Sequence, residues 1–150
     1  MRRMLTGTVV LFLVCFASAR ESATSPSTTP TSSFGYVDLF VDSGAKPLAA
    51  YQIELVISNN AAQVVGIEGG DAGAFSEPPY YDPAAMSQSR VIVAAFSTRT
   101  ELPSHKLRIA RVHLQFHASD RHYEAKLITA ATTDGTRIDA SASVSEGAQP

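Results

Sequence analysis

Residues 106–117 of this chain, KLRIARVHLQFH, alternate apolar and polar side chains with a period of two. Because successive side chains of a β-strand point to opposite faces of its sheet, this alternation predicts a strand with one buried face. The apolar positions are odd-numbered up to Ile109 but even-numbered from Val112 onward. One extra residue near Ile109 produces such a change, so we predict a β-bulge there. Leu114 and Phe116 are then predicted to lie in the core.

The same alternation recurs along the rest of the chain. It covers residues 36–42, 51–58, 123–129 and 138–145. Residues 64–68 form a shorter apolar run, and residues 91–96 are apolar on both faces, so we expect the latter to be a central strand. The pattern predicts seven or eight half-buried strands and contains no long helical period. Strands at this spacing without intervening helices indicate an all-β, antiparallel sandwich.

Turn-forming residues separate these segments. Residues 43–47 and 58–60 are predicted turns, and Asp134-Gly135 is predicted to form a hairpin turn because both residues tolerate positive φ. Residues 69–89 form a long connection. Within it, Asp82-Pro83 is expected to begin one helical turn, with Asp82 as the cap and proline at the first position.

The N-terminal residues are predicted to lie outside the folded domain. Residues 1–19 combine two arginines, an apolar stretch and Ala17-Ser18-Ala19, which is typical of a secretory signal peptide cleaved after Ala19. An uncleaved membrane anchor and a lipidated Cys15 are the alternatives. Residues 20–33 are rich in Ser, Thr and Pro and are expected to form a linker, because they offer no large apolar side chain to bury. The domain is predicted to span residues 34–147, in a protein that is secreted or held in the cell envelope, at most peripheral to a membrane.

Composition excludes several functional classes. The 12 basic and 14 acidic residues give a net charge of −2, without the basic excess that nucleic-acid binding requires. A single cysteine excludes a disulfide framework and a multi-cysteine metal site. No catalytic motif is recognisable, and the acidic residues of the long connection lack the spacing of a calcium loop. We therefore expect a protein that is not an enzyme and that uses no cofactor and no metal.

Four segments, taken in order, resemble those of one known family. They are residues 48–55 (LAAYQIEL), 64–70 (VVGIEGG), 90–97 (RVIVAAFS) and 109–116 (IARVHLQF). Their order and spacing are similar to those of cohesin-like domains. The resemblance implies a nine-stranded jelly-roll sandwich, the fold shared by cohesins and the family 2 and 3 carbohydrate-binding modules. It departs from the family at Ser58-Asn59-Asn60, where many cohesins carry a Tyr-Asp-Pro step.

The resemblance also implies a function without catalysis. Cohesins hold dockerin-bearing proteins, often polysaccharide-degrading enzymes, onto a scaffold, and the partner docks on a sheet. It thus implies an exported, dockerin-like protein as the partner. The strict alternation of Arg111, His113 and Gln115 with apolar neighbours places these three residues on one outward face, where we expect the partner to bind.

A carbohydrate-binding module is the alternative function, with a polysaccharide in place of the protein partner. Residues 78–83, PPYYDP, place Tyr80 and Tyr81 in a proline-stiffened loop, and flat aromatic rings can stack on sugar rings. Tyr36 and Tyr123 are the further candidates for such a surface. Three coplanar exposed rings would favour this alternative, whereas a flat sheet face of mixed polarity would favour protein binding.

Charge is unevenly distributed along the chain. Residues 34–89 hold one lysine and seven acidic residues, whereas residues 90–137 hold eight basic and four acidic residues. An acidic partner is expected if the basic residues of the second half gather on one sheet. The residues concerned are Arg108, Arg111, Lys126 and Arg137.

Overall fold

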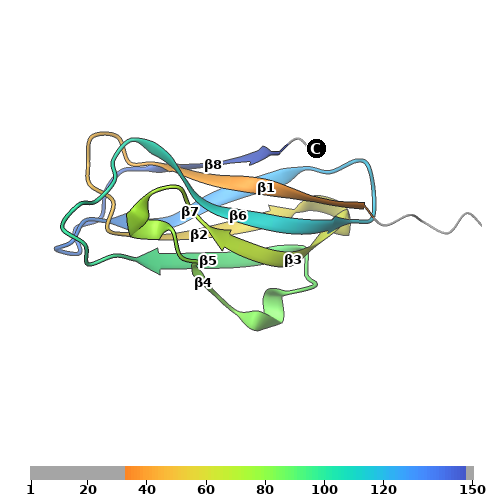
Figure 1. Ribbon diagram of the computed structural model, residues 1–150. Coiled ribbons are helices and arrows are strands. Elements are labelled where there is room, and N and C mark those ends of the chain that lie inside the picture. The colour runs from red at the N-terminus through yellow and green to blue at the C-terminus, as the bar shows by residue number, and fades with distance from the viewer. Residues whose placement is uncertain (1–32, 148–150) are drawn as a thin grey trace, which may run out of the picture.

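A computed structural model describes residues 33–147, which form two four-stranded antiparallel sheets packed face to face (Figure 1). Sheet A has the order β3 (Ala62–Gly69), β6 (Lys106–Phe116), β1 (Ser33–Asp42) and β8 (Ser141–Glu146). Sheet B has the order β4 (Tyr80–Tyr81), β5 (Arg90–Phe96), β2 (Ala50–Ile57) and β7 (Tyr123–Ala131). The predicted all-β antiparallel sandwich is confirmed. The predicted signal peptide and residues 20–32 of the predicted linker lie outside the described residues.

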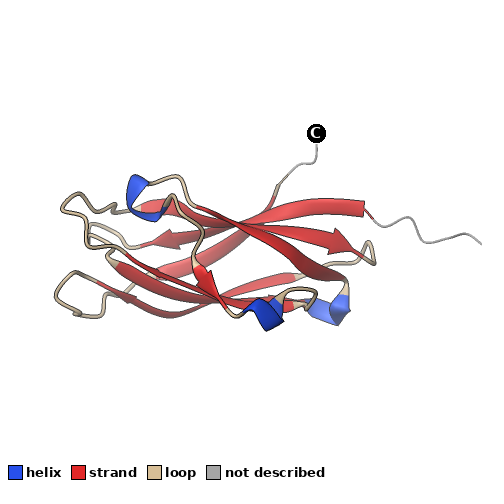
Figure 2. Cartoon of the chain, turned by 60° about the horizontal axis from the view of Figure 1, so that its bottom comes forward, coloured by secondary structure: helices blue, strands red, loops and turns tan. Residues whose placement is uncertain are grey.

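Three short 3₁₀ helices lie between the strands (Figure 2). They are η1 (Ser58–Asn60), η2 (Gly73–Phe75) and η3 (Pro83–Ala85). In η3 the Asp82 carboxylate accepts a hydrogen bond from the Ala84 amide at 2.9 Å, so the predicted cap and proline-initiated turn are confirmed. No helix within residues 33–147 has the length and apolar character needed to cross a membrane.

The bulge predicted in the longest strand is confirmed. Leu39 of β1 pairs with Ala110 of β6, whereas the next residue, Phe40, pairs with Arg108, so Ile109 is the extra residue. Ile109 and Ala110 are therefore both buried. Beyond the bulge the alternation places Leu114 and Phe116 in the core, as predicted.

The core lies between the sheets and is built from the inward residues of both. Most of them come from β1, β2, β5 and β6. Tyr51 of β2 joins the two sheets: its buried hydroxyl donates a hydrogen bond to the Ile109 carbonyl at 3.1 Å, and its ring meets Phe75 edge-on. Ile109, the extra residue of the bulge in sheet A, thus provides the carbonyl that accepts this hydrogen bond from sheet B.

A second bulge, in β7, was not predicted. Ile53 of β2 pairs with Leu127, but Gln52 pairs with Thr129, which leaves Ile128 without a partner on β2. The alternation is reversed beyond this point, so Ala130 rather than Thr129 points into the core. Residues 123–129 read as an uninterrupted alternation because threonine fits either face of a strand.

The prediction that residues 91–96 form a central strand is confirmed in part, because β5 is one of the two interior strands of sheet B. β5 lies between β2 and the two-residue strand β4, next to the edge of sheet B. Tyr80 and Tyr81 were expected in a loop, but they pair with Ala94 and Val93. Prolines frame this strand on both sides, at Pro78-Pro79 and at Pro83, and they limit it to two residues because proline has no amide hydrogen to donate.

The C-terminal segment forms a shorter strand than predicted. Asp134-Gly135 does form a turn, with φ of +81° at Gly135, but only one bridge, between Ala131 and Arg137, follows it. The chain then passes to sheet A, where β8 pairs with β1 from Ser141 onward. Residues 138–140, which the prediction included in the last strand, are therefore not part of β8. The described residues form eight strands, one fewer than the resemblance implies.

Candidate functional surfaces

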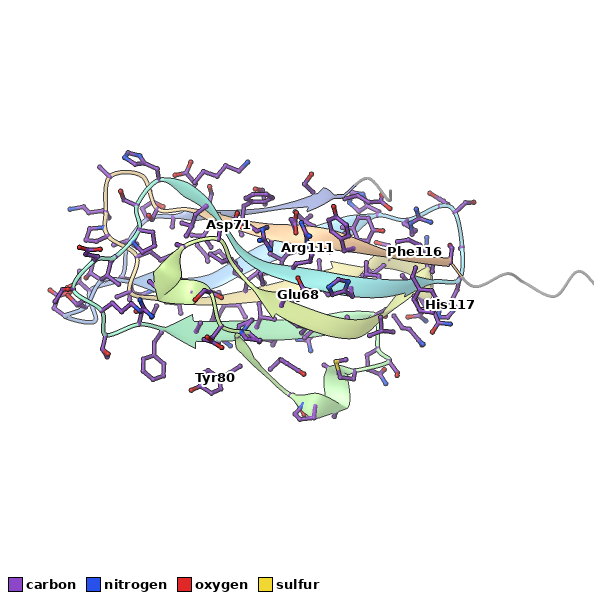
Figure 3. The ribbon with its side chains drawn as sticks, viewed as in Figure 1. Glu68, Asp71, Tyr80, Arg111, Phe116 and His117 are labelled. Carbon is purple, nitrogen blue, oxygen red and sulfur yellow. The ribbon has the colours of Figure 1, made fainter. Side chains whose placement is uncertain are left out.

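The outer face of sheet A carries the three polar residues predicted on β6, and Arg111 lies near its centre (Figure 3). The Arg111 guanidinium donates two hydrogen bonds to the Asp38 carboxylate, at 2.8 and 3.0 Å, and lies 3.9 Å from the centre of the Tyr36 ring. The hydrogen bond to Asp38 raises the pKa of Arg111 above its ordinary value. Arg111 is therefore a fixed, internally neutralised group.

His113 and Gln115 also have partners on neighbouring strands. The Nε2 atom of His113 lies 2.8 Å from the Glu68 carboxylate on β3, and its ring is tilted against Tyr36. The Gln115 side chain accepts a hydrogen bond from the Gln63 amide at 2.7 Å. The structure thus brings the three predicted residues onto one exposed face, and each is held by an intramolecular contact.

The four basic residues considered together do not share a sheet. Arg108 and Arg111 belong to β6 in sheet A, whereas Lys126 belongs to β7 in sheet B and Arg137 follows it. Arg108 pairs with Asp71 and also donates to the Gly69 carbonyl at 3.2 Å. The expectation of an acidic partner loses its basis, because the two arginines of sheet A are already matched by carboxylates, Arg111 by Asp38 on β1 and Arg108 by Asp71 in the connection after β3.

The outer face of sheet B differs from that of sheet A in carrying apolar side chains toward one end. Phe96 is 66% exposed, and Ile92 and Ala94 of the same strand are half-buried on that side. Phe96 aligns with Ala50 of β2, which aligns with Ala131 of β7. In the next row inward, Ala94 aligns with Gln52 and Thr129, so two rows across the sheet carry no charge.

Charged residues of this face lie toward its other end. They are Arg90, Glu54, Lys126 and Glu124, in the two rows that follow. The Arg90 guanidinium donates to the Glu54 carboxylate at 2.5 Å. The result is a face with an uncharged half and a charged half.

The two tyrosines of β4, both candidate binding residues, face opposite sides of the strand. Tyr80 pairs with the outward residue Ala94 and is 71% exposed, whereas Tyr81 pairs with the core residue Val93 and is only 36% exposed. Adjacent residues of a strand point to opposite faces, so Tyr81 borders the sandwich edge. Figure 3 shows Tyr80 pointing away from the sandwich.

The ring that accompanies Tyr80 is Phe96, which the sequence reasoning missed. The two ring centres lie 6.3 Å apart with an angle of 10° between their planes. The sequence does carry a signal, because Phe96 ends a strand that is apolar on both faces, but the same pattern is typical of a strand buried on both faces. Tyr36 lies on sheet A beneath Arg111, and Tyr123 is hydrogen-bonded to Arg121, so neither joins Tyr80.

Three hollows follow one another along this edge of sheet B. The first, of about 570 Å³, lies between residues 80–88 and β5; Tyr80, Asp82, Gln88 and Ile92 are among its lining residues. A second, of about 290 Å³, lies between Tyr80 and Phe96, and a third, of about 350 Å³, lies beyond Phe96. The two aromatic rings thus separate successive hollows.

Within residues 33–147 there is no group of three His, Cys, Asp or Glu side chains placed to hold a metal ion. The chain matches no protein-family model, no curated protein and no solved structure. A function must therefore be inferred from the two outer faces and their residues.

Proposed function

We propose that this chain is a non-catalytic, exported attachment module of cohesin type, which holds a protein partner on the outer face of sheet B. The jelly-roll relationship and a dockerin-like partner are part of this proposal. The observation that carries it is the exposed Phe96 beside the half-buried Ile92 and Ala94, on a face whose charges are confined to one end.

The contrast between the two outer faces supports this choice of surface. The centres of protein interfaces are depleted in charge and enriched in aromatic residues. Sheet A carries an ion pair, Arg111 with Asp38, at its centre. Sheet B carries two uncharged rows, and small residues at Ala50, Ala94 and Ala131 keep them flat. A partner on sheet B has little charge to desolvate.

Carbohydrate binding is the second candidate, and one observation favours it. Tyr80 and Phe96 are both well exposed and nearly parallel, and polar side chains such as Asp82 and Gln88 line the adjoining hollow. Exposed rings flanked by hydrogen-bonding groups suit a sugar chain. The site has two such rings where a typical carbohydrate-binding surface has several, so we rank it second.

The proposed test begins with capture of a partner from the exported proteins of the source organism and continues with titration calorimetry on the protein identified. Phe96→Ser and Tyr80→Ser are each expected to weaken binding by tenfold or more, because exposed aromatic anchors dominate interface energetics. His113→Ala and Gln115→Ala, on the opposite sheet, are the matched controls.

Each outcome selects one surface or one ligand class. If binding survives Phe96→Ser and Tyr80→Ser but is lost in His113→Ala, the binding site lies on sheet A and not on sheet B. Electrophoresis through gels that contain soluble β-glucan or xylan tests the second candidate. Retardation that depends on Tyr80 and Phe96, without any captured protein, would replace the protein partner by a polysaccharide.

A further inference from the structure

The inference concerns β8, which forms one edge of sheet A (Figure 1). β8 pairs with β1 from Ser141 to Glu146 in a regular register, and no strand within residues 33–147 pairs with its other edge. An open edge presents unpaired backbone N–H and C=O groups, which are a template for another strand. β7 approaches β8 from sheet B without pairing with it.

The other three edges of the sandwich are each protected. β4 is limited to two residues by the prolines around it. β3 has a register shift between Val64 and Gly66, and Val64 exchanges backbone hydrogen bonds with residues 87 and 88. β7 has its own bulge and exposes Glu124 and Lys126. Prolines, bulges and charges are the devices by which proteins prevent edge pairing.

β8 has none of these devices over its first five residues. Residues 141–145 read SASVS, without a charge or a proline, and the β1–β8 register contains no shift. Ser141, Ser143 and Ser145 point outward, and Ala142 and Val144 are half-buried on the core side. The edge is therefore straight, small in side-chain volume and uncharged.

We propose that a second copy of this chain pairs with β8 through its own β8, in antiparallel orientation, so that sheet A continues from one copy into the other. A two-fold axis at Ser143 places Ser143 opposite its own copy, Ser141 opposite Ser145 and Ala142 opposite Val144. Outward serines then face outward serines, and core-side residues face core-side residues. A pairing of this kind is closed and isologous.

The charges next to the strand agree with this register. Glu146 faces Ala140 of the second copy, so no like charges meet, and Glu146 is already paired with Arg121 of its own chain at 2.8 Å. A foreign strand would have to match the same alternation by chance, whereas a second copy matches it by symmetry. The pairing leaves sheet B free, so the dimer displays two copies of the proposed docking face, which strengthens binding to any partner that carries two docking segments.

The test is sedimentation velocity over a concentration range, on the purified protein as the cell processes it. The native chain is expected to form dimers in a concentration-dependent manner. Ser143→Lys and Ser143→Glu each place like charges opposite one another on the axis and are expected to weaken dimerisation roughly threefold to fivefold. An equal mixture of the two variants is expected to restore it, because the charges are then opposite. Ser141→Lys faces Ser145 and is the matched control.

A cross-linking experiment tests the register independently. In a Cys15→Ser background, Ser143→Cys is expected to form a disulfide-linked dimer on oxidation, because directly opposite residues lie within disulfide reach. Ser141→Cys is expected not to, because its two copies lie four residues apart along the strand. A native chain that sediments as a monomer at every concentration, or a dimer that both Ser143 variants leave unchanged, would overturn the proposal. Partner binding by Ser143→Lys, measured at a concentration at which this variant sediments as a monomer, separates this result from the proposed function of sheet B.

Discussion

At the scale of single residues, Phe116 and Tyr51 illustrate two kinds of stabilisation. Phe116 is buried at the end of β6, where the Arg121 guanidinium lies 4.0 Å from the centre of its ring. Tyr51 is buried as well, but its hydroxyl forms one specific hydrogen bond across the sandwich. Phe116 contributes apolar burial. Tyr51 provides a hydrogen-bond donor for the Ile109 carbonyl, which the bulge turns toward the core.

Replacing Phe116 by alanine is expected to lower the free energy of unfolding by about 3–5 kcal/mol, because it removes a buried ring and leaves a cavity. Phe116→Leu keeps most of the volume and is expected to cost less than about 1.5 kcal/mol. Denaturant titration followed by circular dichroism measures both values. An alanine variant as stable as the native chain would mean that β6 is phased differently.

Replacing Tyr51 by phenylalanine is expected to cost about 1–3 kcal/mol, because the Ile109 carbonyl is left buried without a donor. Burial also raises the pKa of the Tyr51 hydroxyl above its ordinary value. A folded-state pKa above the unfolded one means that this group's stabilisation is complete below about pH 10 and declines as the pH rises beyond it.

The native chain is therefore expected to lose stability between about pH 10 and 12, and Tyr51→Phe is expected to lose less over the same range. Unfolding titrations at several alkaline pH values measure this difference. Tyr80→Phe, which alters an exposed ring, is the control. Equal pH slopes in the native chain and in Tyr51→Phe would contradict the assignment.

At the scale of elements, the β1–β6 pair forms the centre of sheet A, and its outer side is held by charge rather than by apolar contact. Asp38 and Arg111 lie directly opposite each other in the ladder, and Arg111 covers the Tyr36 ring. The alternation of β6 shows that Arg111 faces outward. It does not show that Arg111 is already engaged, because Asp38 lies 73 residues earlier in the chain.

Arg111→Glu is accordingly expected to destabilise the fold by about 1–2 kcal/mol, because it replaces a charge-assisted pair by two neighbouring carboxylates on a partly exposed face. The exchanged double variant, Asp38→Arg with Arg111→Glu, is expected to recover most of this loss. Thermal melts of the native chain, of the two single variants Asp38→Arg and Arg111→Glu, and of the double variant measure the coupling. Additive losses in the double variant would show that the pair contributes no specific stabilisation.

At the scale of the whole molecule, one core supports two different surfaces. The buried residues of the described domain come from both sheets and form a single cluster. Sheet A ends in an unprotected edge, and sheet B carries the exposed pair Tyr80 and Phe96, so the proposed self-association and the proposed partner binding would use separate parts of the sandwich. This separation is the reason why each proposal can be tested without disturbing the other.

Export is a whole-molecule prediction that the sequence alone supplies. The chain is expected to be cleaved after Ala19, so that the mature protein begins at Arg20. N-terminal sequencing of the secreted or periplasmic fraction checks the cleavage site. Recovery of Met1 from the membrane fraction would support the anchor instead.

The sequence by itself determined the class of fold and the identity of most strands. Period-two alternation is a local property, so residues 106–117 revealed both the strand and its bulge, and Asp82-Pro83 revealed the capped turn. Tertiary structure alone decided the neighbours of each strand. The position of β5 near an edge, the partners of Arg111 and His113, and the stacking of Tyr80 on Phe96 all depend on contacts between distant segments. Alternation shows which side of a strand is apolar, but the order of strands in a sheet decides whether that side is covered.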